Sequence, residues 1–111
     1  MNKFANNTLG TPQIDFNLMK KNAENACRMM KTLANRDRLM LLCQLSQGEK
    51  RVGELEEITH ILQPTLSQQL GVLRQEEIVS TRRDGKHIYY SISSPIAMSV
   101  MELLYATYCG N

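Results

Sequence analysis

Three cysteines and two histidines are the side chains of this chain best suited to bind a metal ion or to react with an oxidant. They are Cys27, Cys43, Cys109, His60 and His87. A zinc site takes three or four nitrogen, sulfur or oxygen ligands that lie close together, often supplied by short-spaced pairs. No short motif joins any two of these five residues. The sequence therefore predicts neither a metal site nor a bound cofactor.

Two roles are open to each cysteine thiol. A free cysteine is commonly a small buried hydrophobic residue, whereas an accessible thiolate reacts with oxidants or sulfur compounds. No segment approaches the roughly 18 apolar residues that span a bilayer, and residues 1–21 lack the apolar core of a secretory signal peptide. We therefore expect a cytoplasmic protein with no membrane partner, whose three thiols rest reduced.

Motifs and net charge limit the classes of function that this sequence can have. We expect no enzyme, because a nucleophilic enzyme needs a base beside its nucleophile and no Ser/His/Asp or Cys/His arrangement is present. The formal net charge of +2 is too small to indicate nucleic acid by itself. However, Arg82, Arg83 and Lys86 surround a single acidic residue, Asp84. Such a basic tip suits a phosphate contact, with a solvated hairpin tip as the alternative.

Hydrophobic spacing predicts one domain over residues 14–111. The preceding residues, 1–13, are rich in Asn, Gly, Thr and Pro and are expected to form a mobile tail. Four helices are predicted in the first part of the domain, at about 15–33, 36–47, 52–59 and 64–76. Asn35 is expected to cap the second helix and Gly48 to end it.

The third and fourth predicted helices are separated only by residues 60–63. Pro64 suits the first helical position of the fourth helix, because its missing N–H is harmless there. Leu66, Leu70 and Leu73 recur at helical spacing and should face the core. Two short helices joined by so tight a turn are the signature of a helix-turn-helix.

After these helices the hydrophobic period changes from helical to two. The alternating runs 79–83 and 87–92 flank Asp84 and Gly85. Asp-Gly between alternating runs is a strong hairpin signal, because the tight turn requires positive φ. The sequence therefore predicts a two-stranded β-wing and a mainly α fold of order ααααββα.

The last predicted helix begins with Ser94 as its cap and Pro95 at its first position. Residues 96–105 leave it almost no polar face, so it must be buried. Because the rest of so small a domain cannot cover it entirely, we expect a homodimer. The alternative is that the helix is only intramolecular core.

Several motifs in order resemble the arsenical-resistance-repressor (ArsR) family. They are Leu-Ala-Asn-Arg-Asp-Arg-Leu at 33–39, Gln-Pro-Thr-Leu-Ser-Gln-Gln-Leu at 63–70, and Leu-Arg at 73–74. The resemblance covers about residues 20–109. It implies a homodimeric winged helix-turn-helix that represses an operon and leaves the DNA when an inducer binds or reacts. His60 and Glu77 stand where glycine is common in the family, and Arg36 where proline is frequent.

The fourth helix would then enter the major groove of double-stranded operator DNA, which is about 12 Å wide and admits one helix. Glutamine pairs with adenine through two hydrogen bonds, and Ser or Thr suits a base edge or a phosphate. Arginine and lysine of the wing would reach phosphates or the minor groove. The predicted DNA-contacting residues are Gln63, Thr65, Ser67, Gln68, Gln69, Arg74, Arg82, Arg83 and Lys86.

The resemblance also bears on what the protein senses. Metal-sensing relatives carry Cys-x-Cys near the helix that here begins at 50–55, or histidines on the last helix, and this chain has neither. Cys43 and Cys109 instead match a thiol-responsive branch that includes the biofilm-growth-associated repressors. That match implies that these two cysteines are oxidised or bridged through sulfur by reactive sulfur species, and that the repressor then leaves DNA. A metal-responsive repressor of the same fold, a small thiol enzyme and a thiol-independent dimerisation or DNA-binding module are the alternatives.

Overall fold

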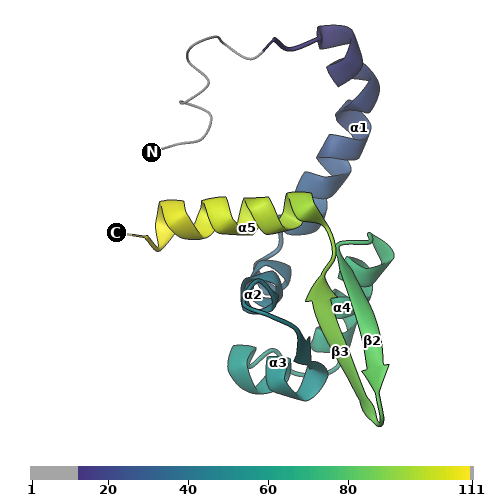
Figure 1. Cartoon of the computed structure of the whole chain (residues 1–111), viewed down its shortest axis with the longest axis vertical. Coiled ribbons are helices and arrows are strands. Elements are labelled where there is room, and N and C mark those ends of the chain that lie inside the picture. Colours follow the sequence, from purple (N-terminus) through teal and green to yellow (C-terminus); the bar gives the residue numbers. More distant parts are fainter. Residues whose placement is uncertain (1–12, 111) are drawn as a thin grey trace.

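The computed structural model describes residues 13–110, which form helices and one small antiparallel sheet (Figure 1). The predicted tail therefore lies, except for Gln13, outside the described residues. The elements are α1 Phe16–Leu33, α2 Arg36–Leu45, β1 Lys50–Arg51, α3 Val52–Thr59, α4 Thr65–Gln75, β2 Val79–Asp84, β3 His87–Ile92 and α5 Pro95–Tyr108. The predicted winged helix-turn-helix is confirmed, with α3 and α4 as its two short helices.

Polar side chains cap the N-termini of α1, α2 and α5. The side chain of Asp15 accepts hydrogen bonds from the first turn of α1, and that of Asn35 accepts from the Arg38 backbone N–H at 3.0 Å. Ser94 caps α5 by accepting from the Ala97 N–H at 3.1 Å. Each cap satisfies a backbone donor that the helix leaves unpaired. The predicted caps Asn35 and Ser94 are thus confirmed.

Two predicted helix boundaries are slightly displaced. Pro64 precedes α4 as its N-cap residue instead of taking the first helical position. The second helix ends at Leu45, three residues before Gly48. There the Ser46 hydroxyl donates to the Cys43 carbonyl at 2.6 Å, and such local side-chain bonding competes with continuation of a helix.

The predicted hairpin is present, and the sheet gains one strand. Strands β2 and β3 pair in register from Val79–Ile92 to Asp84–His87, so the two-residue turn consists of Gly85, with φ of +63°, and Lys86. The sheet order is β1-β3-β2, because Lys50 and Arg51 pair with Tyr90 and Tyr89. The sequence analysis did not predict β1, since two residues are too few to show an alternating pattern.

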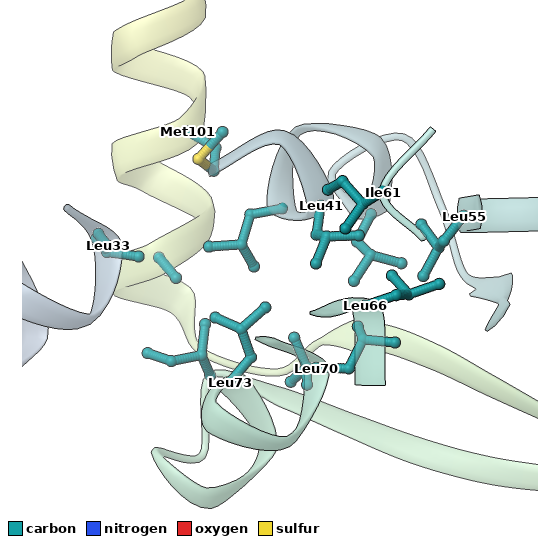
Figure 2. Packing of buried hydrophobic residues seen from close by; sticks show 13 residues of the cluster. Leu33, Leu41, Leu55, Ile61, Leu66, Leu70, Leu73 and Met101 are labelled. Atoms are coloured by element: carbon teal, nitrogen blue, oxygen red, sulfur yellow. The ribbon is translucent and has the colours of Figure 1, made fainter. Parts of the chain in front are cut away.

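The hydrophobic core lies where α2, α3, α4 and α5 meet above the sheet (Figure 2). Leu66, Leu70 and Leu73 of α4 are buried there, which confirms their predicted orientation. They pack in one cluster with Leu41 and Leu55. Burying leucine is worth about 1.5–3 kcal/mol per side chain, so this face fixes which side of α4 points outward.

Within residues 13–110, two non-glycine residues adopt the left-handed backbone conformation, His60 and Glu77, each with φ of 60°. Both stand where glycine is common in the ArsR family, which the sequence resembles. A residue with a side chain adopts this conformation at a cost of roughly 1 kcal/mol, which glycine avoids. Part of that advantage is cancelled, because glycine makes the unfolded chain more flexible. We expect Glu77→Gly to raise the free energy of unfolding by about 0.5–1 kcal/mol, measured by urea denaturation. Glu57→Gly, in the helical conformation of α3, should instead lower it by about 1 kcal/mol.

Candidate nucleic-acid interface

The outer face of α4 is polar because its leucines occupy the opposite face. Ser67 and Gln68 are exposed, and Thr65 is half-buried at the first helical position. Arg74 is exposed in the last turn. The hairpin of β2 and β3 lies beside α4, so polar helix and wing belong to one region of the surface (Figure 1).

Gln63 and Ser67 are hydrogen-bonded to each other across the start of α4. The Gln63 Oε1 atom accepts from the Ser67 backbone N–H at 3.0 Å and from its hydroxyl at 2.7 Å. This pairing satisfies a free N–H of the first helical turn, as a cap does. The two residues therefore stabilise the turn, and they keep only the Gln63 amide hydrogens and the Ser67 oxygen lone pairs for another partner.

The two adjacent glutamines of α4 differ in their surroundings. Among the described residues, the exposed Gln68 amide has no hydrogen-bond partner. The half-buried Gln69 accepts at Oε1 from Nη1 of Arg38 at 2.7 Å. Gln68 is thus free to approach a base edge, whereas Gln69 is already engaged by the protein.

The basic tip of the wing is less positive than the sequence suggests. Arg82 donates to the Glu49 carboxylate, with Nε 2.8 Å from Oε2, and its guanidinium lies 4.5 Å from the centre of the Tyr89 ring. These hydrogen bonds lower the pKa of Glu49 and raise the pKa of Arg82. Arg83 and Lys86 are exposed and form no ion pair with any of residues 13–110. They are the two wing charges that are free for phosphate.

Cys43 of α2 is half-buried against α5. A small pocket of about 230 Å³ is lined by Cys43 together with Glu102, Tyr105 and Ala106 of α5. Cys109 follows Ala106 by three residues and Tyr105 by four, which places it on the same face of α5 one turn farther on. Cys109 itself is exposed at the end of α5 and does not line this pocket. Cys27 is exposed on α1, and all three thiols are free.

The two histidines lie apart in the fold. His60 ends α3, and His87 begins β3, where its ring makes an edge contact with Tyr89. Within residues 13–110, no three side chains of His, Cys, Asp or Glu gather in a way that could hold a metal ion. None of the helices in the same range has the length and apolar character needed to cross a membrane.

Two polar links that connect α1 to α4 have no signal in the sequence. Arg28 of α1 donates to Glu76, at the end of α4, through Nε at 2.7 Å and Nη2 at 3.0 Å. These hydrogen bonds lower the pKa of Glu76 and raise the pKa of Arg28. The other link runs through Arg38. Arg38 belongs to the motif at 33–39, but no local spacing indicates a partner as distant as Gln69.

An apolar groove of about 840 Å³ runs between α1 and α5. Met19, Ala26 and Met30 of α1 line it from one side, and Ile96 and Leu104 of α5 from the other. Met30 and Ile96 are 68% and 61% exposed. The predicted apolar α5 therefore buries only Ala97 and Met101 in its own subunit. A large part of its apolar surface has no cover within the described chain.

Comparison with known proteins connects this geometry to a family. Residues 35–81 match the family described as "Bacterial regulatory protein, arsR family". The biofilm growth-associated repressor of Agrobacterium fabrum is 50% identical over 98 residues, which are 88% of this chain and 84% of the relative. The chain belongs to the ArsR family. The predicted resemblance is confirmed, including its biofilm-growth-associated branch.

Solved structures of ArsR-family regulators share the fold. The transcriptional repressor BigR from Xylella fastidiosa is 45% identical, with a TM-score of 0.80 over 88% of this chain and all of that one. Reduced HlyU from Vibrio cholerae is 38% identical, with a TM-score of 0.78 over 82% of this chain and 96% of that one. These relatives are transcriptional regulators and not enzymes, as predicted. This chain is accordingly a DNA-binding transcriptional regulator of the ArsR family.

Proposed function

We propose that the chain is a homodimeric repressor that binds operator DNA through α4 and the wing and is released by oxidation of Cys43 and Cys109. The observation that carries DNA binding is the exposed polar face of α4 beside the free wing charges Arg83 and Lys86. A helix of this kind fits the major groove, and basic side chains on the wing add phosphate contacts. The relatives named as repressors support repression.

The groove between α1 and α5 supports the homodimer. Exposed apolar patches of more than a few hundred Å² are rare on monomers and mark interaction sites. A second copy of the same two helices offers a surface of matching length and apolar character, and two-fold interfaces bury the same patch on both subunits. A dimer also presents two α4 helices, which can read half-sites about 34–36 Å apart.

The direct test is gel-shift binding to the promoter of the chain's own operon, together with transcription from that promoter in vitro. Reduced protein should bind this duplex with higher affinity than a duplex of scrambled sequence. It should also lower the yield of transcript. A rise in transcript would favour activation, a role suggested by a 38% identical Vibrio cholerae relative that is named a transcriptional activator. Absence of a preference for the promoter would contradict the proposal.

Gln68 is the best placed base-reading residue, because its amide is exposed and unpaired within the described chain. We expect Gln68→Ala to lower operator affinity by about 1–3 kcal/mol while leaving affinity for random duplex unchanged. Fluorescence anisotropy with both duplexes measures this difference. Equal weakening on the two duplexes would show that Gln68 does not read bases.

Arg83 and Lys86 should contribute sequence-independent affinity. Each alanine substitution should weaken binding to all duplexes and reduce the slope of log affinity against log salt by about 1, because one phosphate contact is lost. Lys20→Ala removes the same charge near the start of α1. That end of α1 lies at the opposite end of the described fold from the wing (Figure 1). That control should leave the slope unchanged, and a wing variant with an unchanged slope would contradict the assignment.

The proposed switch uses a persulfide donor, R–S–SH, as oxidant. One cysteine thiolate takes the outer sulfur to form Cys–S–SH and releases R–SH. The second cysteine then attacks the inner sulfur, which forms the disulfide and releases H₂S. The persulfide is reduced by two electrons overall, to R–SH and H₂S, and each cysteine sulfur is oxidised by one electron. The pocket that Cys43 shares with Tyr105 and Ala106, one turn before Cys109, supports this pairing.

A further inference from the structure

Arg38, a residue of α2, joins the last turn of α1 to α4, the proposed recognition helix. The Arg38 side chain donates from Nε to the Thr32 carbonyl at 2.6 Å and from Nη2 to the Lys31 carbonyl at 3.4 Å. Its third donor, Nη1, reaches Oε1 of Gln69. One half-buried guanidinium thus joins two carbonyls of α1 to the middle of α4.

A second link joins the same two helices farther along. Arg28, one turn before Thr32 on α1, holds the carboxylate of Glu76 with two hydrogen bonds. Glu76 follows Gln69 by seven residues, or about 10 Å along a helix. Two attachments at this separation restrict both the position of α4 and its rotation about either attachment.

The chemistry of the Arg38 link determines how the Gln69 amide is oriented. Arginine carries only hydrogen-bond donors, so the oxygen of the amide must face Arg38. A glutamine that reads adenine needs both its oxygen and its nitrogen at the base edge. The Gln69 oxygen is therefore already held by Arg38, whereas the Gln68 oxygen accepts from no side chain among residues 13–110.

We propose that Arg38 and Arg28 position α4 relative to α1, and that Gln69 is a positioning residue and not a base-reading one, an inference that rests on the proposed DNA binding. Because α1 also lines the apolar groove, these links connect the dimer surface to the recognition helix. The spacing of two half-sites then depends on them. Gln69 is accordingly removed from the predicted set of base contacts.

Matched glutamate substitutions test this assignment. Gln69→Glu keeps an acceptor for Arg38, and its new charge is neutralised by that guanidinium. Gln68→Glu makes the same change on the neighbouring exposed position, where the carboxylate meets DNA unpaired. We expect Gln69→Glu to retain affinity for the best duplex from a randomised pool within about threefold, and Gln68→Glu to lose about tenfold or more. Equal losses would overturn the inference.

Removal of the links tests positioning directly. Gln69→Ala should weaken the best duplex by about tenfold, because a hydrogen bond to a charged group is lost, with the base preference at every position and the salt slope unchanged. Loss of preference at one base pair would overturn the inference.

Glu76→Arg should likewise weaken operator binding, measured at a temperature at which the variant is still folded. Adding Arg28→Glu should restore the affinity, because the exchanged charges can pair again. Failure of this rescue would also overturn the inference. If the wild-type protein selects no duplex from the randomised pool, both the proposed function and this inference fail. The contrary results named above for the Gln69, Gln68 and Glu76 variants would overturn only this inference.

Discussion

Met30→Glu should convert the protein from a dimer to a monomer and weaken operator binding by more than about a hundredfold. Met30 is 68% exposed in the isolated chain and lines the apolar groove. The substitution therefore costs the single subunit little, but in a two-fold dimer it places two unpaired carboxylates in an apolar interface. Linking two binding modules raises affinity by about 10²–10⁴-fold, and this gain is lost with the dimer.

Met40→Glu is a suitable control for the dimer. Met40 lies on α2, is 40% exposed and does not line the groove. Sedimentation velocity at micromolar concentration should give twice the chain mass of 12.7 kDa for wild type and for the control, and the chain mass itself for Met30→Glu. Thermal unfolding of Met30→Glu at high dilution should match that of dilute wild type. A wild type that sediments only as 12.7 kDa would contradict the dimer.

Local patterns in the sequence were sufficient for most of the fold. The helical spacing of Leu66, Leu70 and Leu73 and the Asp-Gly pair between alternating runs both depend on residues close together in the chain. Their consequences, a buried face of α4 and a β2–β3 hairpin, follow from local physics. Strand β1 was missed because its two residues form a strand only by pairing with β3.

The candidate site was less predictable because its charges and amides have distant partners. Gln69 and Arg82 have the residue types and positions of DNA contacts. Their partners, Arg38 and Glu49, lie 31 and 33 positions away in the chain. No periodic pattern reveals such a pair, and each pairing changes what the side chain can offer to DNA. Gln68, Arg83 and Lys86 have no such distant partner among residues 13–110, so they keep the DNA-contacting role that their residue types and positions predict.

Oxidation of wild-type protein by a persulfide should release operator DNA, whereas Cys43→Ser and Cys109→Ser should stay bound. The reason is geometric. A covalent link between Cys43 and Cys109 fixes α2 against the C-terminal end of α5, and α5 is one wall of the groove proposed as the dimer interface. Two α4 helices must match half-sites about 34–36 Å apart, so a small change in subunit angle costs affinity, and each 1.4 kcal/mol is tenfold.

Cys27→Ser provides the control for this switch, since Cys27 lies on α1 and does not line the pocket beside Cys43. It should be released by the persulfide as wild type is, and mass spectrometry should show the loss of two hydrogens from both proteins. Binding and oxidation are linked, so operator DNA should in turn slow formation of the disulfide in wild type. Release of Cys109→Ser to the same extent as wild type would contradict the two-cysteine switch. Because each serine variant keeps the volume of a small side chain and removes only the reactive sulfur, such a result would assign sensing to Cys27 or to a metal.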